Sequence, residues 1–168
     1  MNRNKTVCFT GHRRFPKNEK NEISGDLYSA VCKLILEGYE NFICGGAVGF
    51  DTLAAECVLS FKARFPEIRL ILALPCRDQT MRWEDLDDLA RYKRILGEAD
   101  SVEYITPFYT DGCMLERNRW MVDHSAVCIA YLTSNRGGTA YTARYAAENG
   151  LRLINIATGE ETEQLKFC

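Results

Sequence analysis

The chain has 168 residues, of which 46% are hydrophobic and 26% are charged, and its formal net charge is -2. These values are typical of one soluble globular domain that can bury its own core. The charge excludes a general attraction to nucleic acid but leaves a local basic groove open. No apolar run approaches the roughly 18 residues that a membrane-spanning helix needs, and the polar start shows no secretory signal, so a cytoplasmic location is expected.

Short apolar runs alternate with longer amphipathic stretches, which predicts alternating strands and helices. The predicted elements, in chain order, are a strand at 6–10, a helix with its apolar face at 23–35, a strand at 41–44, a helix with its apolar face at 50–61, a strand at 68–74, a charged helix at 83–99, a short strand at 101–105, a helix at 114–123, a strand at 126–131, an alanine-rich helix at 139–149 and a strand at 151–156. The charged helix is expected to turn Leu86, Leu89 and Leu96 inward, and Gly150 should end the alanine-rich helix.

The predicted strands are almost continuously apolar, which is typical of a parallel sheet covered on both faces. Strand–helix–strand units of this kind connect by right-handed crossovers. The sequence therefore predicts an α/β fold, a single Rossmann-like domain over residues 1–168 with a mostly parallel sheet and helices on both faces. Residues 157–168 are expected to form a loosely held tail.

Glycines, cations, amides and aromatic residues are concentrated in the segments that follow the predicted strands. The connections at the opposite edge of the sheet, which lead from helices into strands, do not show this concentration. Because ligands of open α/β sheets bind outside the carboxyl ends of the strands, this asymmetry predicts a ligand site at that edge. The candidate ligand-binding residues are Gly11, His12, Arg13, Gly45, Gly46, Gly49, Asp51, Gln79, Trp83, Arg117, Asn118, Gly137, Gly138 and Thr139.

The first glycine-rich segment, with Gly45, Gly46 and Gly49, comes directly before a predicted helix. Glycines let the backbone approach a ligand, and a helix N-terminus suits a phosphate. A tight strand-to-helix turn explains the same residues equally well. Asp51 would oppose a phosphate beside it, so it is expected to cap the helix or to accept a ribose hydroxyl.

A second glycine pair, Gly137 and Gly138, precedes the last helix, with Thr139 as its expected N-cap. Two glycine-rich helix starts on one edge favour an anion site over simple turns. Arg117, near the start of its own helix, would suit a phosphate at the same edge.

The remaining candidates lie in loops after the first and third strands. His12, Arg13 and Arg14 form either a solvated basic loop or part of the ligand site. Trp83 could stack on a base while Gln79 binds an edge of that base, although Trp83 could equally anchor the helix that it begins.

Eight cysteines are present, but no two form a C-x-x-C pair. They are expected to be reduced core thiols, and no metal site is predicted. The sequence contains neither a P-loop nor a standard dinucleotide-binding fingerprint.

The chain resembles the bacterial YpsA-like family, long described as a domain of unknown function within the SLOG superfamily, which also contains the DprA/Smf proteins and the LOG phosphoribohydrolases. The segments that carry the resemblance are 10–13 (TGHR), 45–56 (GGAVGFDTLAAE), Pro75 with Gln79 and Trp83, and 114–131 (MLERNRWMVDHSAVCIAY). The resemblance covers residues 7–156. It implies a Rossmann-like fold and a pocket for a nucleotide or a related small molecule.

The LOG pattern is only partly present. Met114 and Arg117 match it, but Asn118 replaces a lysine and Thr142 stands where a glutamate would be. Without that carboxylate, LOG-type hydrolysis is not expected, because glycosidic chemistry needs a group that stabilises a cationic sugar or moves protons.

Three functions are therefore compared. The first is binding or sensing of a nucleotide, NAD or an ADP-ribose-like molecule, with no obligatory cofactor. The second is a nucleotide-cleaving enzyme in which Asp51 or Glu116 supplies the catalytic carboxylate. The third is single-stranded DNA binding as in DprA, which needs a basic groove with stacking aromatics. The net charge of -2 argues against it, so nucleic acid is not an expected partner. Self-association into a homo-oligomer is implied by the superfamily resemblance.

Overall fold

The structure, a computed structural model, describes residues 1–162. Its strands are β1 (Thr6–Gly11), β2 (Asn41–Cys44), β3 (Arg69–Leu74), β4 (Ser101–Tyr104), β5 (Val127–Tyr131), β6 (Arg152–Asn155) and β7 (Glu160–Thr162). Its α-helices are α1 (Lys20–Leu36), α2 (Phe50–Lys62), α3 (Leu86–Glu98), α4 (Cys113–Asp123) and α5 (Gly137–Glu148). Two short 3-10 helices precede β1 and α1, at Arg3–Lys5 and Lys17–Glu19.

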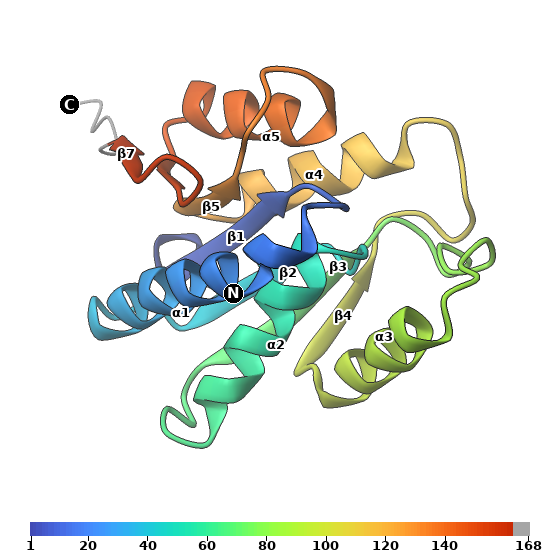
Figure 1. Cartoon of the computed structure of the whole chain (residues 1–168), viewed down its shortest axis with the longest axis horizontal. Helices are drawn as coiled ribbons and strands as arrows, with labels where there is room; N and C mark the ends of the chain where they lie inside the picture. Colours follow the sequence, from blue (N-terminus) through green and yellow to red (C-terminus); the bar gives the residue numbers. More distant parts are fainter. Residues whose placement is uncertain (163–168) are drawn as a thin grey trace.

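The strands form one seven-stranded sheet in the order β4-β3-β2-β1-β5-β6-β7. Strands β1 to β6 are parallel, and β7 runs antiparallel to β6. The chain moves outward from β1 to β4 and then returns to β5 beside β1, so right-handed crossovers place α1, α2 and α3 on one face and α4 and α5 on the other. Figure 1 shows this arrangement, and the predicted Rossmann-like α/β fold is confirmed.

The core has one apolar layer on each face of the sheet. Phe9 and Phe42, with ring centroids 6.3 Å apart, face α1 and α2, whereas Cys8 and Ile43 face α4 and α5. Cys8 lies opposite Cys128 in the β1–β5 register, and all seven cysteines among the described residues are free.

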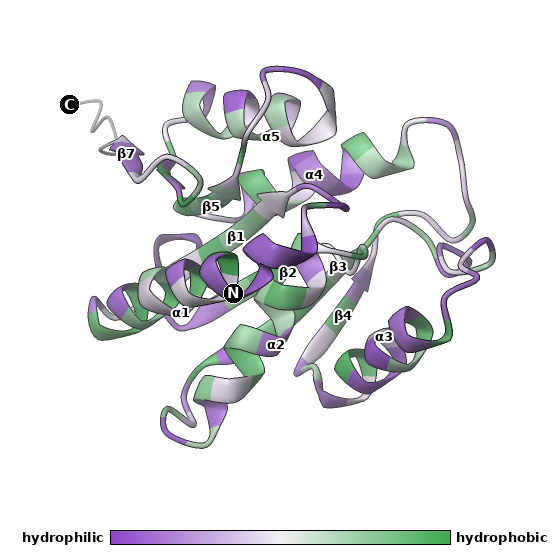
Figure 2. Cartoon of the chain, in the orientation of Figure 1, coloured by the Kyte–Doolittle hydropathy of each residue, from purple (hydrophilic) through white to green (hydrophobic). Residues whose placement is uncertain are grey.

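In Figure 2 hydrophobic residues run along β1 and α2, while much of α3 is hydrophilic. None of the helices in the part of the chain described is long and apolar enough to cross a bilayer.

Helix α3 begins three residues later than predicted. The carboxylate of Asp85 accepts the backbone N–H groups of Asp87 (2.9 Å) and Asp88 (3.0 Å), and this capping fixes Leu86 as the first helical residue. The prediction that Leu86 faces inward is wrong, because its exposure is 78%. Ile95 is the buried residue of this helix.

The last helix and the C-terminal segment also differ from the prediction. Helix α5 begins at Gly137 with Arg136 at the N-cap, so Thr139 is not a cap but the third helical residue, and it is buried. The expected loose tail is wrong for β7, which pairs with β6 and whose Glu161 binds Arg152 at 2.5 Å. The remainder of that tail, 163–168, lies outside the described residues.

Asp100 links the carboxyl end of α2 to the start of β3, and its contacts predict a pH effect on stability. Its Oδ2 accepts the Leu70 N–H (2.8 Å) and the Lys62 ammonium (2.6 Å). Burial alone would raise the pKa of Asp100, but these two hydrogen bonds lower it below its usual value. Because the folded-state pKa is depressed, the stabilisation is present above the unfolded-state pKa and is lost as the pH falls through the folded-state value.

We therefore expect Asp100→Asn to lower the free energy of unfolding at pH 7 and to close the gap to the wild type as the pH falls below about 4. Urea denaturation across this pH range measures the gap. A gap that stays constant with pH would contradict the assignment.

Candidate functional site

Three adjoining cavities lie at the carboxyl ends of the parallel strands. The first has a volume of about 540 Å³ and is lined by Arg13, Ala47, Val48, Asp78, Gln79, Met81, Arg82, Trp83, Tyr109 and Met114. The second, of about 290 Å³, shares Arg13, Ala47 and Met114 with the first. The third, of about 260 Å³, shares Arg13 and Val48 with the first. Arg13, in the loop after β1, therefore borders all three.

The second cavity lies where the strand order reverses, between β1 and β5. This is the position at which open α/β sheets bind their ligands. It brings together predicted residues from four separate segments, namely Gly11, His12, Arg13, Asp51, Arg117, Asn118, Gly138 and Thr139. The first cavity adds Gln79 and Trp83.

Four predicted residues line none of these three cavities. These residues are Gly45, Gly46, Gly137 and Glu116. Glu116 is exposed on α4, whereas Asp51 lines the second cavity. Of the two candidate catalytic carboxylates, Asp51 is thus the one that faces a cavity.

Asp51 and Arg117 form a buried pair in the wall of the second cavity. Arg117 is 5% exposed and Asp51 8%, with Arg117 Nη1 3.8 Å from Asp51 Oδ2. Nη1 also donates to the carbonyl oxygen of Gly45, and Nε donates to Asn118 Oδ1 at 2.7 Å. Asp51 in turn accepts the N–H of Ala47 at 3.2 Å, so it braces the turn before α2 rather than capping the helix, where Gly49 is the N-cap.

Burial dominates the electrostatics of this pair. It raises the pKa of Asp51 above its usual value, and Arg117 and the Ala47 N–H only partly oppose the effect. The same burial lowers the pKa of Arg117, which stays a cation because a guanidinium does not lose its proton in proteins. Two donor atoms of Arg117, Nε and Nη1, are hydrogen-bonded inside the protein.

The glycines of the turn before α2 are required by the packing of the protein itself. A Cβ on Gly45 would lie 2.1 Å from Arg117 Nη1. A Cβ on Gly49, whose φ is +79°, would lie 2.2 Å from the carbonyl oxygen of Arg13. Packing against Arg117 accounts for Gly45 and the turn conformation accounts for Gly49, so close approach by a ligand is not needed to explain them.

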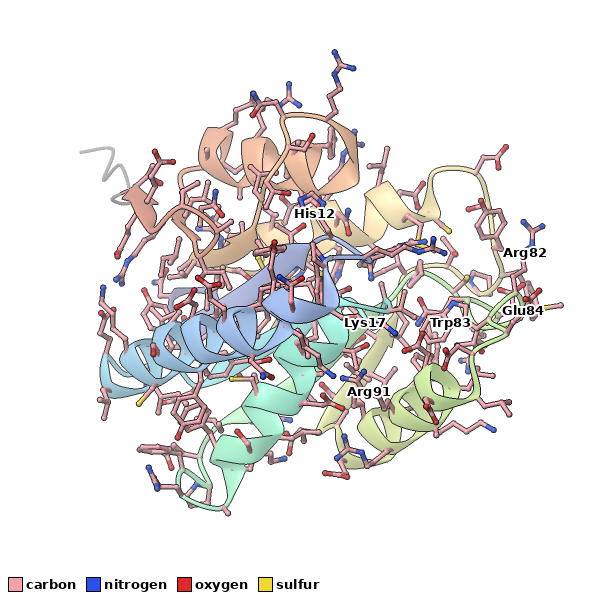
Figure 3. All side chains as sticks on the ribbon, in the orientation of Figure 1. His12, Lys17, Arg82, Trp83, Glu84 and Arg91 are labelled. Carbon is pink, nitrogen blue, oxygen red and sulfur yellow. The ribbon has the colours of Figure 1, made fainter. Side chains whose placement is uncertain are left out.

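Aromatic and amide groups form the wall of the first cavity. Trp83 is half-buried and packs edge-on against Tyr92, with ring centroids 5.3 Å apart. Gln79 Nε2 donates to the carbonyl oxygen of Gly46 at 3.3 Å, which ties the loop after β3 to the turn after β2. In Figure 3 Arg82 and Trp83 lie on the loop before α3. Trp83 is not part of that helix.

Tyr109 and Arg82 are polar or aromatic residues of the first cavity that were not among the predicted site residues. Tyr109 is 56% exposed, and its N–H donates to Asp78 Oδ1 at 3.0 Å, which links the loops after β4 and β3. Arg82 is exposed beside Trp83. Their position at the carboxyl edge was the available signal, but nothing in the sequence distinguishes them from other loop residues.

His12 and Asn118 are held by neighbouring elements. His12 Nε2 accepts the N–H of Thr133 at 3.1 Å, which places the proton of a neutral ring on Nδ1. Asn118 Nδ2 donates to Thr142 Oγ1 at 2.9 Å and so joins α4 to α5. Within residues 1–162 no group of three or more His, Cys, Asp or Glu side chains is arranged to hold a metal ion.

Comparison with known proteins identifies the family. A family model described as the YspA SLOG family matches residues 7–154, and the chain belongs to this family. The uncharacterized SPbeta prophage-derived protein YoqJ of Bacillus subtilis is 33% identical over 143 residues, covering 77% of this chain and 83% of that protein. A UPF0398 protein of Staphylococcus epidermidis is 29% identical over 130 residues, covering 72% of this chain and 69% of that protein.

Two solved structures of DNA processing protein A share the fold. The Helicobacter pylori protein, described by its single-stranded DNA binding mode, matches with a TM-score of 0.61 and 22% identity over 88% of this chain. The Streptococcus pneumoniae protein matches with a TM-score of 0.63 and 18% identity over 88% of this chain. The chain spans 63% and 48% of the lengths of those two chains.

These neighbours correct one prediction. The expectation that nucleic acid is not a partner was wrong, because a protein with this fold, the Helicobacter pylori DNA processing protein A, binds single-stranded DNA. The expectation rested on the net charge of the whole chain, and that quantity does not describe one edge of the sheet. Arg13, Arg14, Lys20 and Arg91 all line the third cavity at this edge.

Proposed function

We propose that the chain binds a nucleotide or a nucleotide derivative at the carboxyl edge of its sheet. The observation that carries this proposal is the first cavity, which combines two aromatic side chains, an amide and two arginines in about 540 Å³. Cavities of roughly 300–1,000 Å³ with a few convergent polar groups are typical of small-molecule sites.

Each group has a role that fits a nucleotide. Trp83 and Tyr109 offer ring faces on which a base can stack. Arg13 and Arg82 suit phosphate, because a guanidinium presents paired donors to its oxygens. The second cavity, joined to the first at Arg13, would take the sugar beside Asp51.

The test is a thermal-shift screen of nucleotides, NAD and ADP-ribose with the wild type, Trp83→Ala and Arg13→Ala. A ligand at about 100 times its Kd adds roughly 2.7 kcal/mol, which raises the Tm of a chain of this size by about 5–10 °C. We expect both variants to lose most of the shift. Arg64→Ala is the matched control, because Arg64 is exposed and lines none of the three cavities.

A flat screen on folded wild-type protein would overturn the proposal. A shift that Trp83→Ala and Arg13→Ala both retain would place the ligand elsewhere and would contradict the role of the first cavity.

A second candidate is binding of single-stranded nucleic acid at the same edge. It is favoured by the shared fold with the Helicobacter pylori DNA processing protein A and by the run of arginines and aromatic rings across the first and third cavities. Fluorescence anisotropy of a labelled oligothymidine tests it. Binding that weakens steeply between about 50 and 200 mM salt would support this candidate, and no binding at low salt would exclude it.

A further inference from the structure

The third cavity adjoins the first at Arg13 and Val48, and its wall is strongly basic. It lies between the segment that leads into α1, the start of α2 and α3. Four of its lining residues are cations, namely Arg13, Arg14, Lys20 and Arg91, and Asp88 is its one carboxylate. This is a marked concentration of positive charge on a chain whose net charge is -2.

Of these four cations, only Arg91 forms an ion pair among residues 1–162. Arg91 is paired with Glu56 through bonds of 2.9 and 2.7 Å. Arg14 and Lys20, in contrast, make no ion pair or side-chain hydrogen bond among residues 1–162, although the charge of Lys20 helps to lower the pKa of Glu56. The Arg13 guanidinium donates a hydrogen bond to Met114 Sδ at 3.9 Å, and its charge opposes the rise that burial causes in the pKa of Asp51.

Clustered like charges repel each other, and an anion that binds among them removes this cost. The first cavity has a different character, because Trp83 and Tyr109 give it aromatic walls. An elongated ligand with an aromatic end and a densely anionic end would fit both cavities, with its aromatic end in the first cavity and its anionic end in the third. Arg13 lies at the junction and can contact both parts.

We propose that the third cavity holds the terminal phosphates of the ligand, and that the ligand is a nucleoside di- or triphosphate whose base lies in the first cavity. This inference rests on the proposed function. A dinucleotide or ADP-ribose carries its phosphates internally and would place an uncharged sugar among these cations. A nucleoside monophosphate would reach Arg13 but leave Arg14 and Lys20 without a partner.

Isothermal titration calorimetry tests the inference, with AMP, ADP, ATP and ADP-ribose, and the guanine series in parallel, in buffer with EDTA. We expect the affinity of the wild type to rise at least about tenfold from monophosphate to triphosphate, since a charged hydrogen bond contributes roughly 1.5–3 kcal/mol. The double variant Arg14→Ala, Lys20→Ala should lose at least about tenfold for the triphosphate and no more than about threefold for the monophosphate.

The matched control removes the same charge elsewhere. Arg64→Ala combined with Arg144→Ala alters two exposed arginines that line none of the three cavities. It should bind the triphosphate like the wild type. If nucleotides bind but the monophosphate and triphosphate do so equally, or if Arg14→Ala, Lys20→Ala keeps its triphosphate affinity, the inference is overturned and the proposed function stands. If no nucleotide binds the wild type, both the inference and the proposed function are overturned.

Discussion

Arg117→Ala is expected to lower the free energy of unfolding by about 3–5 kcal/mol, because removing one partner leaves a buried charge without compensation. Arg117 is 5% exposed, and its loss would deprive both Asp51 and the Gly45 carbonyl oxygen of a partner. Urea denaturation at pH 7 measures the change. Arg64→Ala, which removes an exposed arginine, should stay within about 0.5 kcal/mol of the wild type.

The deficit of Arg117→Ala should also depend on pH. Burial already raises the pKa of Asp51, and without Arg117 nothing of comparable strength opposes it. A carboxyl whose folded-state pKa is raised favours folding below the unfolded-state pKa and loses that contribution as the pH rises through the folded-state value. The deficit should therefore shrink as the pH falls from 7 toward about 4. A deficit below about 1 kcal/mol at pH 7 would contradict the buried pair.

Arg117 is therefore a poor probe of the proposed ligand site. Arg117 lines the second cavity, but its substitution would change stability and binding together. Arg13, Arg82 and Trp83 are better probes, because they lie in loops at the cavity wall and the two arginines are exposed.

Gly49→Ala is expected to destabilise the protein by about 3 kcal/mol or more. Gly49 adopts φ 79° and ψ −121°, a conformation that side chains rarely tolerate. Its new Cβ would also lie 2.2 Å from the carbonyl oxygen of Arg13, which cannot move away as the end of a flexible side chain can. Because Arg13 borders all three cavities, the variant should lose ligand binding even under conditions in which it remains folded.

Gly25→Ala provides the contrasting control. Gly25 lies inside α1, and a Cβ there would meet nothing within 4 Å. Alanine favours a helix over glycine by about 0.8–1.0 kcal/mol, so this variant should be more stable than the wild type. Thermal denaturation of the two variants compares them directly. Equal stability of Gly49→Ala and the wild type would show that the turn before α2 differs from the structure described.

The periodicity of apolar residues was sufficient to predict the order and type of the elements. Buried strands such as 126–131 and the glycine at position 150, whose φ is +74°, leave clear local signals. The start of α3 was placed too early because the capping carboxylate of Asp85 acts through geometry that a charge-rich segment does not display. The pairing of β7 was missed because that strand is entirely exposed and carries no apolar pattern.

The sequence predicted the sheet edge at which the candidate site lies, but it did not predict which of its residues are buried in the wall and which border the cavities. The rule that ligands bind at the carboxyl edge predicted that His12, Arg13 and Trp83 lie there, and these residues line the cavities found at that edge. The sequence could not show that Arg117 is turned inward toward Asp51, since that depends on packing between α4 and the turn before α2. Nor could it show that Arg13 joins three cavities, because each cavity is assembled from segments far apart in the chain.

The central claim is that a nucleotide lies against Trp83 in the first cavity, and the fluorescence of this side chain tests it most directly. The chain has two tryptophans, Trp83 and Trp120, and the second lies on α4 stacked on His124. In Trp120→Phe, with excitation selective for tryptophan, titration with ATP should change the emission of Trp83 saturably. The reciprocal variant Trp83→Phe should show no such change. An unchanged Trp83 signal at ATP concentrations that stabilise the protein against heat, or an equal change from Trp120, would contradict the claim.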